Sequence, residues 1–332
     1  DPSASVADWV VRTVEGLGAG WCPPGMLGIG VGGSADRAMA LARQALGDPI
    51  DIADLIRRGP RDRTEALRLE IYERVNALGI GAQGVGGVTT VLDVRIRSFP
   101  THAASLPVGL IPNCAATRHV SFTLDGTGPA RFTPPDLSDW PEVLLDTAHA
   151  TARRIDLDAL TDAEVAALEP GQTLLLSGTL FTARDAAHRR MVEMLDRGEA
   201  LPVDLRGRAI YYTGPAPAAG GEVIGPAGPT TATRMDRFTD RLLSATGLKL
   251  MIGKAERGPE AVAAIARHAA AYLIAVGGAA YLVSMAIEEA EPVAFHDLGM
   301  EAIHRLRVRD MPVTVAVDAR GNSIHRSGPA AW

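Results

Sequence analysis

The sequence is poor in cysteine and carries no excess of positive charge. Its 332 residues include two cysteines, Cys22 and Cys114, which excludes a disulfide-rich secreted scaffold. Lys and Arg together number 33 against 39 Asp and Glu, which gives a formal net charge of −6. Proteins that bind nucleic acid usually carry a basic surface, so no nucleic-acid partner is expected.

A secretory signal is also missing from the start of the sequence. No positively charged segment followed by an apolar one opens the chain. Together with the sparse cysteines, this favours a cytoplasmic location. The sequence begins at Asp1 and not at a methionine, so we expect the natural N-terminus to lie further upstream.

One stretch, residues 269–287, has no charged residue and is long enough to be considered as a membrane span. Gly277 and Gly278 interrupt it, and Tyr281 and Ser284 make it more polar. We therefore predict a buried strand at 272–276, a glycine turn and a helix at 279–287, and no membrane partner.

Length and apolar periodicity predict an α/β (α+β mixed) protein of two domains, since a domain holds roughly 150 residues. Prolines in 133–141 break regular structure, so we place a linker at 136–152 between domains at 1–135 and 153–332. In the second domain, we predict strands at 173–181, 209–212, 248–252 and 312–317, and helices at 184–197, 234–245 and 259–270. This alternation favours helices layered on a sheet.

Three cationic residues follow predicted strands of the second domain. Arg184 lies in Thr182-Ala183-Arg184-Asp185, a capping-box pattern at a helix start, where backbone N–H groups attract anions. Arg234 follows a Gly/Pro-rich loop in which Thr230 or Thr231 can cap a helix, and Lys254 follows the strand at 248–252.

Ligands of α/β sheets gather beyond the carboxyl ends of strands, so these three cations suggest one pocket for a small dianion. Each also has a plain structural interpretation. Arg184 could pair with a surface acid, the Thr-rich loop could simply cap a helix, and Lys254 could be a solvated lysine.

A glycine motif in the first domain suggests a different activity. Gly28-Ile29-Gly30-Val31-Gly32-Gly33 satisfies the G-x-G-x-x-G pattern of dinucleotide-binding sites. Asp48 and Asp51 lie at a plausible distance for a ribose contact, but residues 48–54 are not typical of a strand. The pattern leaves two interpretations, a nicotinamide site and a glycine-rich turn from strand to helix.

The two cysteines and a histidine are the other candidates for chemistry in the first domain. Cys22 precedes Pro23 and Pro24, which stiffen the backbone and present the thiol on a loop. Cys114 lies further along, shortly after His102. Spacing alone also allows two buried, inert thiols and a structural histidine.

Several strings of the sequence resemble the iron–sulfur-dependent class I fumarate hydratases, and the resemblance spans essentially the whole chain. The most specific string is Gly228-Pro229-Thr230-Thr231 followed by Arg234-Met235-Asp236. The other matching strings are Cys22-Pro23-Pro24, Gly79-Ile80-Gly81-Ala82-Gln83, His102, Asn113-Cys114-Ala115, Gly178, Arg184-Asp185, Ile210-Tyr211-Tyr212, Lys254 and Leu298-Gly299-Met300-Glu301-Ala302-Ile303.

The resemblance implies a hydro-lyase that interconverts (S)-malate and fumarate plus water, a reaction of the tricarboxylic acid cycle. It implies a [4Fe-4S] cluster whose open iron acts as a Lewis acid, with Cys22 and Cys114 as two of its three cysteine ligands. The remaining ligand belongs to a Cys-Gln-Asp-Thr-Gly motif of the family's leading region. That motif is absent here, so the fragment alone is expected to be inactive.

The resemblance also assigns roles to the candidate residues. Arg184, Arg234 and Lys254 match residues that bind the substrate's carboxylates, Thr230 matches the proposed proton-abstracting base, and His102 matches an active-site histidine. It implies that 1–135 is the C-terminal portion of the cluster-binding domain and 153–332 a swivelling β/β/α domain that binds substrate. A homodimer is the implied assembly.

Three alternatives stay open at this point. A related hydro-lyase could act on tartrate or mesaconate, because one substitution in the pocket can redirect substrate choice. An NAD-dependent oxidoreductase could use 28–33. The chain could also be a non-catalytic subunit.

Overall fold

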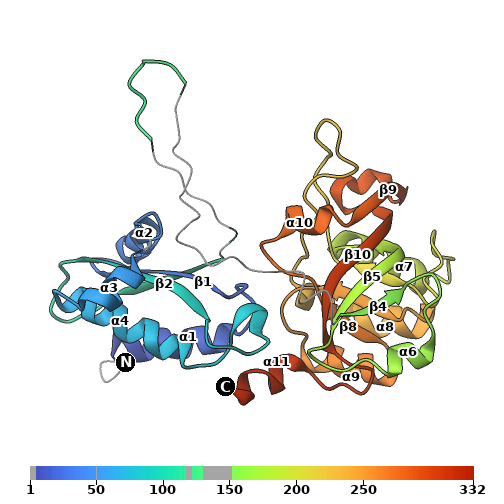
Figure 1. The fold of residues 1–332 in the computed structure, drawn as a ribbon, viewed down its shortest axis with the longest axis horizontal. Coiled ribbons are helices and arrows are strands. Elements are labelled where there is room, and N and C mark those ends of the chain that lie inside the picture. Colours follow the sequence, from blue (N-terminus) through green and yellow to red (C-terminus); the bar gives the residue numbers. More distant parts are fainter. Residues whose placement is uncertain (1–4, 50, 115, 117–121, 130–151) are drawn as a thin grey trace.

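A three-stranded and a seven-stranded sheet organise the two parts of the chain (Figure 1). The computed structural model describes residues 5–49, 51–114, 116, 122–129 and 152–332. The predicted linker, 136–152, lies outside the described residues except for its last residue. The structure is a mixed α/β protein, as predicted.

The first part packs helices on both faces of its sheet. Its elements are α1 (Val6–Leu17), β1 (Gly25–Gly32), α2 (Ala35–Ala45), α3 (Ile52–Arg58), α4 (Arg63–Asn76), the 3-10 turn η1 (Ala82–Gly84), β2 (Val91–Phe99) and β3 (Val108–Cys114). The central strand β1 runs parallel to β2 and antiparallel to β3. In Figure 1, α2 lies above the strands, and α1 and α4 lie below them.

The glycines of 28–33 lie mostly within β1 and do not form a phosphate-binding turn. A Cβ on Gly28 would stand 2.3 Å from the carbonyl oxygen of Ala42, and one on Gly30 would stand 1.9 Å from that of Ala38. Glycine therefore allows α2 to pack directly on the strand. A dinucleotide site needs these glycines between the strand and the helix, so the nicotinamide interpretation is wrong.

The second part alternates strands and helices. Its elements are β4 (Arg153–Asp156), α6 (Asp162–Ala166), β5 (Thr173–Thr182), α7 (Asp185–Asp196), β6 (Ala209–Tyr211), η2 (Ala232–Met235), α8 (Asp236–Thr246), β7 (Leu250–Gly253), α9 (Pro259–Arg267), β8 (Ala271–Ile274), α10 (Ala280–Ser284), β9 (Ile287–Ala294), η3 (His296–Glu301), β10 (Ile303–Val317), α11 (Ile324–Ser327) and η4 (Pro329–Ala331). Every strand and helix predicted here is present, although α10 is shorter than the predicted 279–287.

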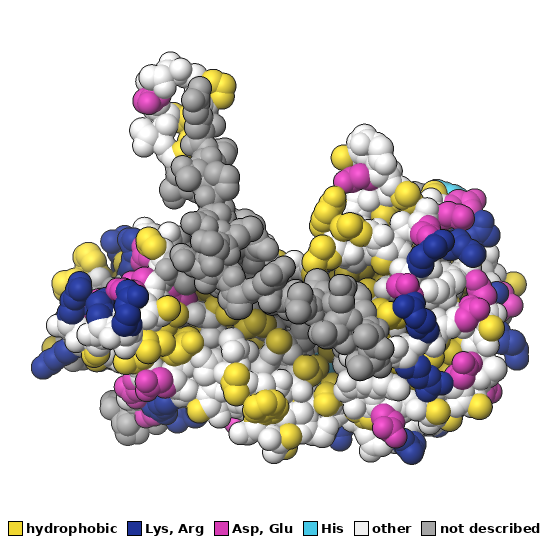
Figure 2. All heavy atoms as spheres, viewed as in Figure 1, with side chains coloured by type: hydrophobic (Ala, Val, Ile, Leu, Met, Phe, Trp, Pro, Cys, Tyr) yellow, Lys and Arg dark blue, Asp and Glu magenta, His cyan; other side chains and the backbone are white. Residues whose placement is uncertain are grey.

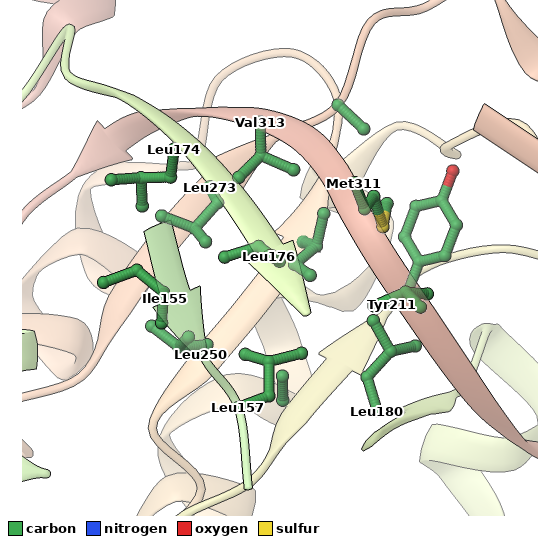
Figure 3. Packing of buried hydrophobic residues seen from close by; sticks show 14 of the residues in the cluster. Ile155, Leu157, Leu174, Leu176, Leu180, Tyr211, Leu250, Leu273, Met311 and Val313 are labelled. Atoms are coloured by element: carbon green, nitrogen blue, oxygen red, sulfur yellow. The ribbon is translucent and has the colours of Figure 1, made fainter. Parts of the chain in front are cut away.

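The seven-stranded sheet curls back on itself. Its strand order is β4-β5-β6-β7-β8-β10-β9, and β4 to β8 are parallel. The long strand β10 pairs antiparallel with β8 and also with β5, which closes the sheet around an apolar interior. Figure 3 shows side chains of this interior, among them Leu174, Leu176, Leu273, Met311 and Val313.

Alternation along the strands builds a second apolar layer under the helices. Tyr211, Ile252 and Leu273 belong to the interior cluster, whereas their neighbours Ile210 and Met251 belong to the cluster beneath α7, α8 and α9. This period of two places one side chain in each layer.

Truncating Leu176 should lower stability strongly. Its side chain is fully buried, and Leu→Ala in a packed core costs about 2–5 kcal/mol. We expect Leu176→Ala to reduce the free energy of unfolding in urea by about 3 kcal/mol. Leu124→Ala, at a side chain that is 82% exposed, should change it by less than about 0.5 kcal/mol. Equal losses in the two variants would contradict this packing.

The end of the chain returns to the first part. His325 Nε2 lies 3.1 Å from the backbone oxygen of Gln83. A Cβ on Gly86 would lie 2.6 Å from the carbonyl carbon of Gly328, and one on Gly79 would lie 3.0 Å from Trp332 Cβ. The segment 324–332 therefore packs against the glycine-rich loop that carries Gln83.

Charged side chains of both signs are mixed over the face shown in Figure 2, and they concentrate toward the outer flanks of the two parts. Hydrophobic side chains gather on the side of the second part that faces the first, around α10 in Figure 1. Within the described ranges, no helix combines the length and apolar character needed to cross a membrane.

Candidate active site

The two thiols meet at one end of the first sheet. Cys22 lies just before β1 and is buried, and Cys114 ends β3, where it pairs with Gly25. Both are free cysteines. They line a cavity of about 420 Å³ together with Gln83 and residues 274–279 of the second part. The cavity therefore lies where the two parts of the chain meet.

Lys254 brings a positive charge to the thiol pair. It directly follows β7. Its side chain and the Cys22 thiol both lie against Gly277, where a Cβ would stand 3.3 Å from Lys254 Cδ and 3.5 Å from Cys22 Sγ. Burial raises the pKa of this thiol, and Lys254 opposes the rise because a nearby cation favours the thiolate. The other lysine of the sequence, Lys249, lies at the opposite end of β7 and pairs with Asp162 at 2.8 Å.

Backbone hydrogen bonds attach Thr230 to Lys254. The Lys254 N–H donates to the Thr230 carbonyl at 3.1 Å, and the Thr230 N–H donates to the Tyr212 carbonyl at 2.7 Å. The loop at Thr230 therefore lies between the ends of β6 and β7. The Thr230 hydroxyl accepts a hydrogen bond from Arg234 Nη1 at 3.2 Å. Thr231 is the N-cap residue of η2, as predicted, but its side chain makes no capping hydrogen bond, and Met235 is the N-cap residue of α8.

Each arginine of the group is held by a carboxylate. Arg234 pairs with Asp185, with 2.6 Å between Nη2 and Oδ2. Arg184 Nη2 lies 3.6 Å from Glu301 Oε1, and its buried Nε has no hydrogen-bond partner among the described residues. A Cβ on Gly214 would stand 2.7 Å from Arg184 Nη1, so the glycine gives the guanidinium its space. Arg184 therefore keeps one buried donor without a partner among the described residues.

The start of α7 differs from the predicted capping box. Arg184 is the N-cap residue, and no side chain caps from that position. The Thr182 hydroxyl accepts a hydrogen bond from the N–H of His304 at 2.9 Å. Glu301 Oε2 instead accepts the N–H of Ala186 at 2.8 Å. The predicted capping box is wrong, because the carboxylate of Glu301, distant in the sequence, accepts a backbone N–H at the start of α7 in its place.

Six of the seven predicted site residues form one continuous group. Arg184, Arg234 and Lys254 lie beyond the carboxyl ends of β5, β6 and β7, which are parallel neighbours. Asp185, next to Arg184 in the sequence, pairs with Arg234, which bonds to Thr230, and Thr230 bonds to Lys254. Lys254 and Cys22 both lie against Gly277, and Cys22 shares a cavity with Cys114. The cations at this edge of the seven-stranded sheet therefore adjoin the thiols of the first part.

His102 is the residue that the structure does not bring to this group. It is exposed in the loop between β2 and β3, and its Nδ1 accepts the N–H of Ala104 at 3.1 Å. That loop adjoins Gly32, whereas Cys114 pairs with Gly25. The two ends of β1 lie about 23 Å apart at a rise of about 3.3 Å per residue.

Gln83 belongs to the site although residue types alone did not select it. Its Oε1 accepts the N–H of Gly277 at 3.1 Å, and its Nε2 donates to the Pro23 carbonyl at 3.3 Å. It therefore joins the first part to the cavity wall. A neutral amide gives little signal in a single sequence, and the surrounding glycine-rich string was the feature that could have found it. The partner acids Asp185 and Glu301 were likewise not selected.

The thiol pair suits part of an iron–sulfur site. Within the described ranges, no group of three or more His, Cys, Asp and Glu side chains is placed to hold a metal ion. Cys22 and Cys114 nevertheless offer two thiols to one cavity, and thiolates are the ligands that iron–sulfur clusters use. A third thiolate would have to come from outside this sequence, which has no other cysteine.

His188 is a buried side chain that contacts the backbone at Arg184, and it should make the stability of the fold sensitive to acid. Its ring packs edge-on against Tyr212, with 5.2 Å between centroids, and its Nδ1 lies 2.8 Å from the Arg184 carbonyl. Burial lowers the pKa of His188 to about 4. Between about pH 6.5 and 4, the unfolded chain therefore binds a proton that the folded chain does not. Stability should fall by about 3 kcal/mol as the pH falls through this window.

Urea unfolding at pH 7 and pH 4 measures this contribution. His188→Phe removes the titrating ring and keeps an aromatic side chain in place. The difference in unfolding free energy between the two pH values should shrink by about 3 kcal/mol in the variant. An unchanged difference would show that His188 does not titrate as proposed.

Comparisons with known proteins give the family. The model described as Fumarate hydratase (Fumerase) matches residues 1–123, and the model Fumarase C-terminus matches residues 126–328. Fumarate hydratase 2 of Leishmania major is 34% identical over 340 residues, covering 97% of this chain and 58% of that protein. The anaerobic class I fumarate hydratase of Escherichia coli is 33% identical over 331 residues, covering 95% of this chain and 59% of that protein.

A third relative matches a smaller region. The L(+)-tartrate dehydratase subunit beta of Escherichia coli is 36% identical over 159 residues, covering 46% of this chain and 77% of that subunit. The chain spans less than two thirds of the length of the two fumarate hydratases. The C-terminal family model alone matches more than half of the chain. The chain therefore belongs to the family of class I fumarate hydratases.

Proposed function

We propose that the protein is a hydro-lyase that interconverts (S)-malate and fumarate plus water. The observation that carries this proposal is that Arg184, Arg234, Thr230 and Lys254 lie next to one another and beside the two thiols. Malate carries two carboxylates, which three adjoining cations can bind. Its hydroxyl is a poor leaving group, and the adjacent thiols can hold a metal that assists its departure.

Cys22 and Cys114 would hold two irons of a [4Fe-4S] cluster, with a third thiolate supplied from outside this sequence. When bound, such a cluster supplies a Lewis acid that makes the hydroxyl a better leaving group. Lys254 favours the thiolate form of Cys22, which is the form that binds iron. The residues present fit the group in ligand type and in their shared cavity.

Arg184, Arg234 and Lys254 would bind the two substrate carboxylates. Loss of a proton beside a carboxylate moves negative charge onto that carboxylate, and cations fixed before the reaction stabilise the charge. Arg184 has its buried Nε without a partner among the described residues. Arg234 already faces Thr230 and is paired with Asp185, which fixes its orientation.

Thr230 would take the proton at Oγ1. A free hydroxyl is a weak base at neutral pH, so this role needs help from its surroundings. Arg234 Nη1 donates a hydrogen bond to Oγ1 at 3.2 Å, and such a charged donor favours the alkoxide. The same guanidinium would therefore bind substrate and support the base.

A substrate panel tests the proposal. The full-length protein, loaded with iron and sulfide without oxygen, should form fumarate from malate with no nicotinamide present. We expect kcat/KM for malate to exceed that for tartrate and mesaconate by at least about tenfold. Preference for tartrate would support the second candidate, a tartrate hydro-lyase, which the identity to L(+)-tartrate dehydratase subunit beta favours. Turnover that requires nicotinamide, or none at all, would overturn the proposal.

His102 would act on the cavity of a second copy, because its own cavity lies at the other end of β1. We propose that this assembly is a cytoplasmic homodimer. A mixed dimer of His102→Asn and Lys254→Met chains would then contain one intact site. It should recover about half of the wild-type activity, while each variant homodimer stays inactive. An inactive mixed dimer would exclude action across the dimer.

A further inference from the structure

A buried guanidinium lies directly behind the cationic group. The Arg257 side chain is completely buried, and it lies in the turn between β7 and α9, close after Lys254. Its Nε donates to Asp236 Oδ1 at 2.6 Å, and its Nη2 donates to the Thr239 hydroxyl. A fully buried cation is costly unless it is paired and hydrogen-bonded. The position of Arg257 therefore depends on its contacts with Asp236 and Thr239.

Asp236 connects this unit to the segment that carries Arg234. It is the first residue of α8 and lies just beyond Arg234 in the sequence. Its Oδ2 accepts the N–H of Gly258 at 2.7 Å, so one carboxylate joins the starts of α8 and α9. Thr239 donates to the Met235 carbonyl at 3.1 Å. The turn at Arg234 is therefore anchored to the turn that follows Lys254.

Two tyrosines connect the same guanidinium to Lys254 and Thr230. The Arg257 guanidinium lies 5.0 Å from the Tyr272 ring centroid and 5.7 Å from that of Tyr212. The Tyr272 hydroxyl donates to the Ala255 carbonyl at 2.8 Å, next to Lys254. The Tyr212 carbonyl accepts the Thr230 N–H at 2.7 Å.

The contact between Tyr212 and β7 is also tight. A Cβ on Gly253 would stand 2.9 Å from Tyr212 Cδ2 and 3.3 Å from the Thr230 carbonyl oxygen. Movement of the Tyr212 ring would therefore displace the backbone at Gly253, directly before Lys254.

We propose that Arg257 is a positioning residue that sets the spacing of Lys254, Thr230 and Arg234. It touches none of the reacting atoms. It acts through Asp236 on the Arg234 turn, through Tyr272 on the turn after Lys254, and through Tyr212 on Thr230. This inference rests on the proposed dicarboxylate chemistry and adds a residue that controls the geometry of the site.

Three variants distinguish a role of Arg257 in positioning the site from a role in the stability of the fold. Arg257→Lys keeps the charge but loses the planar fork that reaches Asp236 and Thr239 together. Arg257→Met removes the charge. The double variant Arg257→Met/Asp236→Leu replaces the whole pair with apolar side chains, which often restores the stability that a broken buried pair has lost.

We expect both single variants to lower kcat/KM for malate by at least about tenfold, because misplacement by about 1 Å can cost more than that. The double variant should regain much of the melting temperature that Arg257→Met loses, but its kcat/KM should stay low. Full recovery of kcat/KM in the double variant, or normal kcat/KM in Arg257→Lys, would overturn the proposal.

Arg95 provides the matched control in the first part. Its side chain is 3% exposed and lies 3.5 Å from the fully buried Asp93. Arg95→Met should lower the melting temperature comparably while leaving kcat/KM for malate unchanged. An equal loss of kcat/KM would show that Arg257→Met acts only through general loss of stability.

Binding of malate, measured by calorimetry without turnover, separates this inference from the proposed function. If the wild-type protein binds malate but does not dehydrate it, the proposed function fails, while weaker binding by Arg257→Lys still supports positioning. If binding is equal in the wild-type protein and Arg257→Lys, the positioning role fails whatever the reaction is.

Discussion

Replacing either thiol, as Cys22→Ser or Cys114→Ser, should abolish cluster loading and lower malate turnover by at least about 1,000-fold. Lewis-acid stabilisation is worth several kcal/mol, and each 1.36 kcal/mol corresponds to about tenfold in rate. Serine keeps the approximate size of cysteine but is a poor ligand for iron. Iron content and visible absorption measure loading, and turnover is measured in the same anaerobic samples.

Unfolding in urea shows whether these serine variants remain folded. Both thiols border a cavity, so the oxygen-for-sulfur exchange should change the unfolding free energy of the cluster-free chain by less than about 1.5 kcal/mol. Full iron content together with full turnover in either variant would exclude that residue as a ligand.

Lys254→Met should lower kcat/KM for malate by about 100- to 1,000-fold. Its ammonium is the cation that adjoins the thiols, so its loss leaves a carboxylate in the cavity without a charged donor. Removing one such fixed donor typically costs about 10²–10³ in rate. Steady-state kinetics of the full-length, cluster-loaded protein measure the effect.

Lys249→Met is the matched control, because the two lysines lie at opposite ends of β7. Lys249 pairs with the exposed Asp162, and such pairs contribute about 1 kcal/mol or less to stability. We expect its kcat/KM to stay within about twofold of the wild-type value. Comparable losses in the two variants would mean that Lys254 supports the strand and not the chemistry.

The regular pattern of the second part made its fold predictable, and the first part was harder. Apolar runs at 173–181 and 209–212 correspond to β5 and β6, because strands that are largely buried are rich in aliphatic residues. The glycines of β1 were interpreted as a turn. In fact Gly28 and Gly30 lie in a strand, where they admit α2, a close approach that sequence spacing cannot reveal.

Strand β10 was predicted only in its apolar half, 312–317. Its first half alternates Leu306 and Val308, which are buried, with Arg305 and Arg307, which are exposed. That period of two was a strand signal in the sequence. Strand β9 was missed because three exposed glutamates, two of them consecutive, interrupt its apolar pattern.

The cationic group was predicted from the ends of parallel strands, a rule that holds for Arg184, Arg234 and Lys254. Its partners could not be predicted in the same way. Glu301 reaches Ala186 from η3, across a sequence separation that no local pattern encodes. The contact between Lys254 and Cys22 likewise joins the two parts of the chain, so it depends on their packing.

A crystal structure of the full-length, cluster-loaded protein with malate bound tests the central claim most directly. We predict that each malate carboxylate lies within hydrogen-bond distance of Arg184, Arg234 or Lys254, and that the carbon bearing the hydroxyl faces the metal held by Cys22 and Cys114. Malate bound elsewhere, or two cysteines that carry no metal, would contradict the account.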